Sequence, residues 1–536
     1  MRLTDSIKLL TLAAITAGIA ACGGSAGNLP PAGPPGVPPP SSPAMVTNKI
    51  VGLGDSLTAG YQSSGMLGQT NVPLGQAEFT SIGLTTVPPT QENGFFSVFY
   101  SAAKGMTWVQ QATPGVSVLP LIAGPGIGNQ ILPANPADTG GYPFATVPGR
   151  SSCDAFNQSA YAYTASSGAG ATVRMNPTSV TYDLGIPSLT LAEAIGMRQP
   201  LTTTCSELYN PPASVAQAEI DALQTLVSGE SENYYPVMEK YSSPASPMSP
   251  LQAAESLHPT LTTVWLGAND LLRYIFSAGT APGIDTTASQ VRTHMTTIIQ
   301  GLRHSGSDVI VATLPNVIET PQFAIVGNPP SQAYCQIQTW LPCILYEFGL
   351  APTFALAEGY TTGVLIASDS FLAPSGSQNA YLTETGLITL LASGANPASL
   401  SASANGSEYL TASFAAQSQS VNAAINSGIL AAASATGVPV VRVDQIFDGI
   451  YSGSGPYFAA AASINPPKCC TLAFGGGLLT FDGLHPSDTG YALIASSFAQ
   501  TANGAFGTSI PAINAAGAYT GAGGIFAPYP DPYALH

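Results

Sequence analysis

A serine, an aspartate and a histidine in two short segments could together carry out acyl transfer. Ser56 directly follows an apolar run and the turn Gly54-Asp55, while Asp482 and His485 lie three residues apart near the other end of the chain. A serine hydroxyl is a poor nucleophile until an imidazole accepts its proton. A carboxylate at the other ring nitrogen fixes the tautomer of that imidazole. These residue types predict a Ser-His-Asp site, provided that the fold brings Ser56 to His485.

Each of these residues also has a simpler interpretation. A serine after a strand often caps the following helix, and an Asp-x-x-His segment on its own is a weak signal. Asp444 and Asp448 also follow an expected strand and could take the place of Asp482 as the triad acid.

An acyl-transfer site also needs hydrogen-bond donors for the negatively charged oxygen of its tetrahedral intermediate, each worth roughly 10²–10³ in rate. Asn269 follows an apolar, strand-like run, so its side-chain amide could be one donor. The backbone amides of Ser188, which lies in a Gly/Pro turn, and of Ser56 are the other candidates.

The elements that must position these residues follow a repeated strand–turn–helix pattern. Such repetition predicts a doubly wound α/β sheet, in which the carboxyl ends of parallel strands share one edge and can gather distant residues. We expect strands at 50–53, 261–266, 308–314 and 438–443, with a short one after 180, and helices at 94–104, 213–226, 271–276, 286–304, 410–436 and 487–500.

Four short blocks resemble those of the SGNH/GDSL esterases and lipases: Gly54-Asp55-Ser56-Leu57, Asp183-Leu184-Gly185-Ile186-Pro187-Ser188, Gly267-Ala268-Asn269-Asp270 and Asp482-Gly483-Leu484-His485-Pro486. The resemblance implies a three-layer α/β/α, flavodoxin-like parallel sheet that needs neither cofactor nor metal. It implies Ser56 as nucleophile, Asp482 and His485 as its triad partners, and Asn269 in the oxyanion hole. Ser188 departs from the pattern, because the family has a glycine whose backbone amide donates there.

These blocks predict a serine esterase or lipase that cleaves carboxylic esters, lipid-like or short acyl, through an acyl-enzyme. Two alternatives stay open. One is a carbohydrate O-acetyl esterase, and the other is a surface binding or adhesion protein on a degenerate hydrolase fold. The serine at position 188 is the one feature that favours the binding protein.

The composition restricts the possible partners. Only 8% of the 536 residues are charged and the net charge is -16. Nothing in such a chain would neutralise the phosphates of a nucleic acid or attract it to anionic lipid. We therefore expect an ester substrate, no nucleic acid, a monomer, and a membrane attachment that is hydrophobic or covalent.

The amino terminus predicts such an attachment. Arg2 and Lys8 precede an apolar run from Leu9 to Ala21, which is too short to span a bilayer and is typical of a secretory signal. Ile19-Ala20-Ala21-Cys22 resembles a bacterial lipobox, so Cys22 would be lipidated and the exported protein anchored in the cell envelope, at the outer membrane. The alternative is an ordinary signal peptide with Cys22 left free.

The domain organisation follows from these motifs. We expect a signal peptide at 1–21, a Pro-rich linker at 22–47, the hydrolase domain at 48–505 and an Ala/Gly/Pro-rich tail at 506–536. Two insertions in the domain, about 62–177 and 317–403, carry no motif. A long insertion without regular structure is often functional.

The cysteines other than Cys22 number six, and an even number in an exported chain suggests disulfides. A pair between Cys335 and Cys343 closes the shortest loop, and Cys469-Cys470 could form a vicinal bond. None of these cysteines lies at a metal-ligand spacing from a histidine, so we expect no metal site. The other two of the six cysteines are Cys153 and Cys205.

Overall fold

The computed structural model describes residues 43–62, 65–69, 72–73, 86–87, 89–111, 118–122, 127–128, 175–176, 179–196, 234, 237–238, 240–241, 246, 248–281, 283–320, 323, 380–382, 409–463, 478–480 and 483–515. These residues all belong to one compact unit, Pro39–His536. The expected signal peptide, all seven cysteines, Asp482, the helix at 213–226 and most of both insertions lie outside the described residues.

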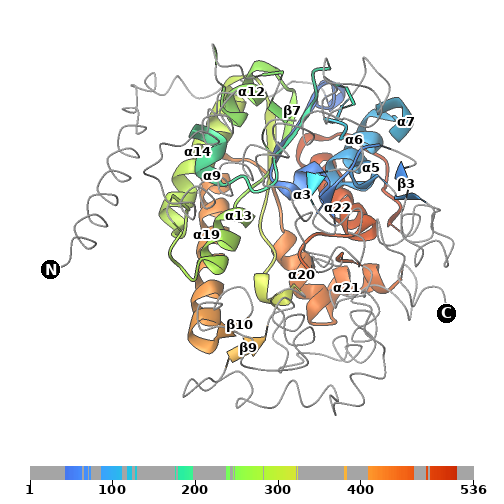
Figure 1. Cartoon of the computed structure of the whole chain (residues 1–536). Coiled ribbons are helices and arrows are strands. Elements are labelled where there is room, and N and C mark those ends of the chain that lie inside the picture. The colour runs from blue at the N-terminus through green and yellow to red at the C-terminus, as the bar shows by residue number, and fades with distance from the viewer. Residues whose placement is uncertain are drawn as a thin grey trace, which may run out of the picture. The chain divides into compact units, whose positions relative to one another are not determined.

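Five parallel strands form the central sheet, which lies between two groups of helices (Figure 1). The strands lie side by side in the order β11-β8-β7-β1-β6, so that, counted along the chain, their order is 2-1-3-4-5. All four neighbouring pairs are parallel. The α/β class expected from the strand–turn–helix pattern is confirmed. The strands are β1 (Ile50–Gly54), β6 (Asp183–Gly185), β7 (Leu261–Trp265), β8 (Asp308–Ala312) and β11 (Val440–Val441).

The three longest strands, β1, β7 and β8, are buried along their whole length. This is the pattern of a parallel sheet that is covered on both faces, and it explains why these three strands carry no charged residue except Asp308. In β1 the register places Ile50 opposite Leu261 and Gly54 opposite Trp265, so β1 and β7 end at the same level. Side chains that follow these two strands therefore emerge at one edge of the sheet.

One face of the sheet is covered by α6 (Phe95–Lys104) and α22 (Asp488–Phe506), which lie against each other. The ring of Phe95 stacks on that of Phe498 at a centroid distance of 4.8 Å and meets Trp265 edge-on at 5.3 Å. The segments that follow the first and the last strand of the sheet are thus joined through aromatic packing.

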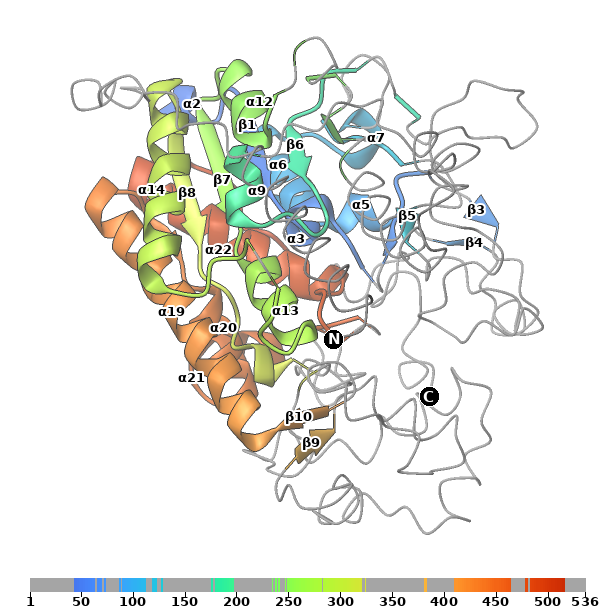
Figure 2. The ribbon, with the colours of Figure 1, turned by 60° about the vertical axis from the view of Figure 1, so that its left-hand side comes forward.

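The other face is covered by four helices whose ribbons stand together in Figure 2. The 17-residue α14 packs along the 25-residue α19, and each is preceded by a threonine that caps the helix, Thr287 and Thr411. These helices are α9 (Leu191–Gly196), α12 (Pro250–Ser256), α14 (Ala288–His304) and α19 (Ala412–Thr436).

The remaining elements are short and lie around the sheet. They are α2 (Pro43–Val46), α3 (Ser56–Ala59), β2 (Gly65–Met66), β3 (Val72–Pro73), β4 (Thr86–Val87), α5 (Thr90–Asn93), α7 (Trp108–Gln111), β5 (Ile127–Gly128), α13 (Ala268–Phe276), the 3-10 helix η1 (Val317–Glu319), β9 (Ala380–Leu382), β10 (Tyr409–Thr411), α20 (Val443–Tyr451) and α21 (Gly455–Ala462). Across the described part of the chain, no helix combines the length and the apolar character that a membrane crossing requires.

Three expected boundaries were wrong, and one of them is the end of the last helix, because α22 ends at Phe506 rather than at 500. The helix after β7 begins at Ala268 rather than at 271, so Asn269 lies in its first turn. The strand expected at 438–443 is only Val440–Val441, and α20 begins at Val443. The apolar residues Val443, Ile446, Phe447 and Ile450 are buried at helical spacing, and that periodicity continues the apolar run of the strand without a break, which hides the boundary.

Candidate active site

Ser56 is the first residue of α3 and follows β1 after a single residue, Asp55. Asp55 caps this helix, because its Oδ1 accepts the backbone N–H of Leu57 at 3.0 Å. Gly60 ends the helix in the left-handed conformation, with its N–H bonded to the carbonyl of Ser56. The capping role that Ser56 could have had belongs to Asp55, and the Ser56 hydroxyl is left for another interaction.

Two glycines let the backbone pass close to this turn. A Cβ on Gly185 in β6 would lie 2.3 Å from the backbone nitrogen of Ala59, and one on Gly54 would lie 2.8 Å from the carbonyl oxygen of Trp265. Neither contact leaves space for a side chain, so the backbone of β6 lies directly against α3, and that of β7 directly against the end of β1.

His485 meets Ser56 across 429 residues of sequence, with its Nε2 2.9 Å from the Ser56 Oγ. When the ring proton is on Nδ1, Nε2 accepts the hydroxyl hydrogen, as a general base requires. The ring also packs against Tyr61 at a centroid distance of 5.0 Å. The structure therefore joins the two residues whose meeting the sequence left open. The triad acid expected beside them, Asp482, lies outside the described residues.

The loop that carries His485 is fixed by backbone hydrogen bonds. Thr480 donates to the carbonyl of His485 from its backbone N–H at 2.8 Å and from its hydroxyl at 3.0 Å. Gly483, with φ 67°, takes the left-handed conformation that the tight turn needs and donates to the Thr480 carbonyl. The imidazole therefore projects from a closed turn rather than from an open loop.

A buried carboxylate ties the helix after this loop to the segments near Ser56. Asp488, in the first turn of α22, accepts the side-chain amide of Gln62 at 2.9 Å and that of Asn93 at 3.0 Å. Burial raises the pKa of Asp488 to about 8, against the lowering effect of the Gln62 hydrogen bond. Because these amides belong to residues 62 and 93, the histidine loop and the serine turn are held in one framework.

The first turn of α13 places Asn269 at the same edge of the sheet. Its Nδ2 donates one hydrogen to the carbonyl of Leu189 at 3.3 Å, which orients the amide group and leaves the second hydrogen of that nitrogen for another acceptor. Asn269 is 8% exposed, as is Ser56. Both residues are thus nearly buried yet reachable by a small group.

Ser188 takes the left-handed conformation, with φ 71°. This is the conformation that favours glycine, and it explains why a glycine is expected at this position. The turn is held by Arg273, whose Nη2 donates to the Ser188 carbonyl at 2.8 Å while its guanidinium pairs with Glu193 at 2.7 Å. The serine therefore preserves the backbone turn, and its side chain is exposed.

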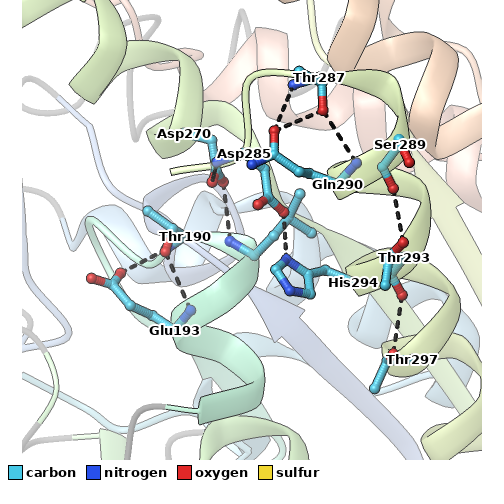
Figure 3. Close-up of polar contacts among 11 residues, drawn as sticks. Thr190, Glu193, Asp270, Asp285, Thr287, Ser289, Gln290, Thr293, His294 and Thr297 are labelled. Atoms are coloured by element: carbon cyan, nitrogen blue, oxygen red, sulfur yellow. Dashed lines mark hydrogen bonds and ion pairs between the residues drawn. The ribbon is translucent and has the colours of Figure 1, made fainter. Parts of the chain in front are cut away.

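Asp270, next to Asn269, connects three elements through its buried carboxylate (Figure 3). One oxygen accepts the backbone N–H of Leu191 at 3.0 Å and the other that of Asp285 at 2.8 Å. Asp285 in turn holds the ring of His294 at 2.6 Å. Burial raises the pKa of Asp270 to about 7, and the two backbone hydrogen bonds oppose that rise. This network fixes α9, α13 and α14 behind the candidate donors.

Asp55 is a third carboxyl group of the site, after Asp488 and Asp270, whose pKa is strongly raised. It is fully buried, and burial raises its pKa to about 7, although the hydrogen bond from Leu57 and the nearby charge of His485 lower it. Within the described residues its Oδ2 has no hydrogen-bond partner. Asp55 thus shapes the turn and the local charge rather than serving as a solvated surface acid.

The two alternative triad acids are engaged elsewhere. Asp444 accepts the hydroxyl of Thr313 at 2.6 Å and the Nε of Arg442 at 2.8 Å. Burial would raise the pKa of Asp444, but the hydrogen bonds from Arg442 and Thr313 bring it below its usual value. Asp448 interacts with the carboxyl of Glu319.

A pocket opens beside Ser56 and His485, with about 550 Å³ of empty space including the part open to solvent. Among the described residues, no group of histidine, cysteine and carboxylate side chains is placed to hold a metal ion.

The comparisons with known proteins add no assignment: no family model, no curated protein and no solved structure matches this chain. The site is therefore interpreted from its own geometry.

Several residues that build the site were not foreseen from the sequence. Arg273 holds the Ser188 turn, Tyr61 packs on the imidazole, and Asp488 joins the two halves of the site. Of these three, only Arg273 could have been noticed in the sequence. It is one of just 13 Lys and Arg residues, and it lies one helical turn after Asn269. His294 is half-buried and paired with Asp285.

Proposed function

We propose that this protein is a serine hydrolase that cleaves carboxylic esters through an acyl-enzyme. The observation that carries the proposal is the 2.9 Å contact between Ser56 Oγ and His485 Nε2, made across 429 residues at the edge of a parallel sheet. The start of α3 is already capped by Asp55, so the imidazole is not needed to hold that helix end. An adjacent base is what a nucleophilic serine needs.

In the proposed reaction, His485 Nε2 takes the proton of the Ser56 hydroxyl as Oγ attacks the ester carbonyl carbon. The carbonyl oxygen becomes an oxyanion, bound by the Asn269 amide and the backbone N–H groups of Ser188 and Ser56. Collapse of this intermediate breaks the bond to the alcohol oxygen, which leaves with the proton from His485. Water then attacks the acyl-Ser56 ester by the same route, releasing the acid. Asp482 is proposed to hold the Nδ1 proton.

The position of the pair in the sheet supports this assignment. Strand order 2-1-3-4-5 is the flavodoxin-like order, and in such sheets ligands bind at the carboxyl edge where the strand order reverses, between the first and third strands. Those strands are β1 and β7, which carry Ser56 and Asn269. The three-layer SGNH hydrolase fold is therefore the specific fold that we propose, with GDSL-type esterases and lipases as the family.

Two other functions were considered from the sequence. A binding or adhesion protein would have no use for a serine–imidazole contact, and the one feature that favoured it, Ser188, keeps the left-handed turn that the donor needs. A carbohydrate O-acetyl esterase would share the same catalytic residues and differ in its substrate pocket. The carbohydrate O-acetyl esterase is therefore the second candidate, and an esterase or lipase acting on lipid-like or short acyl esters is the first.

The cellular setting is a separate proposal, supported by the amino-terminal sequence alone. We propose export through the signal at 1–21, lipidation of Cys22 and attachment to the cell envelope. Metabolic labelling with a palmitate analogue would test it, with Cys22→Ala as the control that should lose the label.

The decisive test of the activity is hydrolysis of p-nitrophenyl butyrate by the full chain. We expect turnover by the wild type and a loss of at least about 10³-fold in Ser56→Ala and in His485→Gln. The matched control is Ser497→Ala, which should have the turnover of the wild type; Ser497 is a half-buried serine of α22 whose hydroxyl donates to the carbonyl of Leu493. Unchanged turnover in Ser56→Ala, with its fold intact by circular dichroism, would refute the proposal.

A further inference from the structure

Two of the proposed oxyanion donors come from segments that are far apart in the chain. The N–H of Ser188 belongs to the turn after β6, whereas the side-chain amide of Asn269 belongs to the first turn of α13. Donors stabilise an oxyanion when they point at one position, and a displacement of about 1 Å can cost roughly 10²-fold in rate. The contacts that fix the Ser188 turn against α13 therefore bear on the reaction.

The turn that carries Ser188 is tied to β1 on one side. The N–H of Ile186 donates to the carbonyl of Gly54 at 2.9 Å, and the N–H of Leu189 donates back to the carbonyl of Ile186 at 3.1 Å. The ring of Pro187 keeps its φ at about −65°. Ser188 follows with φ 71°, a conformation that an L-residue disfavours by roughly 5- to 30-fold. A contact on the other side of Ser188, at its carbonyl, therefore helps to keep the direction of its N–H.

Arg273 makes that contact from α13. Its Nη2 donates to the carbonyl of Ser188 at 2.8 Å. Arg273 lies four residues after Asn269, so the two side chains share one face of the helix. Asn269 itself donates to the next carbonyl of the turn, that of Leu189, at 3.3 Å. Two successive carbonyls of the turn are thus bonded to one face of α13.

Glu193 fixes the direction of the guanidinium group. Its Oε1 accepts from Nη1 of Arg273 at 2.7 Å, and its Oε2 accepts from Nη2 at 3.0 Å. Because Nη2 carries two hydrogens, the second one is directed at the Ser188 carbonyl. Glu193 is held in turn by the backbone N–H of Thr190, which donates to Oε2 at 2.9 Å. The paired side chains are 29% and 23% exposed, and an ion pair with such exposure contributes little to stability.

We propose that Arg273 is a positioning residue of the reaction, which keeps the Ser188 N–H and the Asn269 amide directed at the same oxyanion. This inference rests on the proposed esterase function and names a residue outside the four catalytic blocks. Arg273 acts through the turn and not on the reacting atoms. Without it the ester still binds, but the oxyanion loses part of its stabilisation, so kcat falls while KM stays the same.

The test measures the hydrolysis of p-nitrophenyl butyrate by three arginine variants of the full chain. Arg273→Met removes every donor and keeps an unbranched side chain, whereas Arg273→Lys keeps a donor for the Ser188 carbonyl. The matched control is Arg303→Met. Arg303 also donates to a backbone carbonyl, that of Thr436, but it lies in the last turn of α14, before β8 begins and so at the opposite edge of the sheet from Ser56.

We expect kcat of Arg273→Met to fall by about 10- to 100-fold, which is less than the loss of a whole donor, with KM within about twofold of the wild type. Arg273→Lys should show a smaller fall of kcat with the same KM, and Arg303→Met should keep both constants. An unchanged kcat in Arg273→Met, an equal fall in Arg303→Met, an equal fall in Arg273→Lys, or a loss carried by KM alone would each overturn the inference.

Failure of the inference differs from failure of the activity itself. If no ester is hydrolysed in a Ser56-dependent way, the proposed function is wrong and the positioning role of Arg273 is wrong with it. If Ser56→Ala and Asn269→Ala lose activity while Arg273→Met keeps the kcat of the wild type, the esterase stands and the positioning role is wrong.

Discussion

Replacing Ser188 by glycine should stabilise this protein. Ser188 has φ 71°, a conformation that costs an L-residue roughly 1–2 kcal/mol. Glycine adopts it freely but loses about 0.5–1 kcal/mol through the greater entropy of its unfolded chain. The Ser188 side chain is exposed, and the hydrogen bond from Arg273 goes to the backbone carbonyl, which glycine keeps. The net expectation is a gain of about 0.5–1 kcal/mol in the free energy of unfolding.

The assay is urea denaturation of the variant and two controls. Ser188→Ala keeps a Cβ in the strained conformation and should gain nothing. Ala278→Gly relieves a φ of 52° at an exposed position just after α13, remote from the proposed oxyanion donors, and should gain a similar amount. If Ala278→Gly gains stability while Ser188→Gly loses it, the left-handed turn proposed for the oxyanion donor is wrong.

Three further predictions follow from the surroundings of the site. Asn269→Ala should lower kcat by about 10²–10³-fold with little change in KM, because the donor acts on the oxyanion; an unchanged kcat would remove Asn269 from the mechanism. Asp55 ionises near pH 4 when unfolded but at about 7 in the fold, so the wild type loses stability as pH rises between these values. Asp55→Asn should lack this loss, which is on the order of 4 kcal/mol, in urea titrations at pH 4.5 and 8; parallel curves would contradict the burial argument. The hydrogen bond that the His294 ring donates to the Asp285 carboxylate raises the pKa of His294, against the effect of burial. His294→Gln should therefore destabilise most below about pH 6.5, where the histidine is charged in both states, and least above the folded pKa; a pH-independent loss measured by thermal unfolding would contradict it.

The sequence was informative about the sheet because its strands are buried on both faces. Runs such as 50–53 and 308–312 are continuous apolar segments followed by turn residues, and this pattern needs no knowledge of distant contacts. The parallel class also predicts that residues after different strands share one edge, which made a meeting of Ser56 with His485 possible without establishing it.

What the sequence could not provide depends on long-range packing. The start of α20 at Val443 is set by burial of its apolar side chains, which local propensity does not reveal. The role of Arg273 depends on the turn at Ser188 lying beside α13, 85 residues away in the chain. The perturbed pKa of Asp55 depends on complete burial, and the same residue type at a surface turn would titrate normally.

The central claim is that the Ser56 hydroxyl is a nucleophile activated by His485. The most direct measurement is covalent labelling of the full chain with an alkyl fluorophosphonate, followed by peptide mass spectrometry. The account predicts one adduct per chain, located on Ser56 and lost in His485→Gln. An unlabelled protein, or an adduct on another serine, would contradict it.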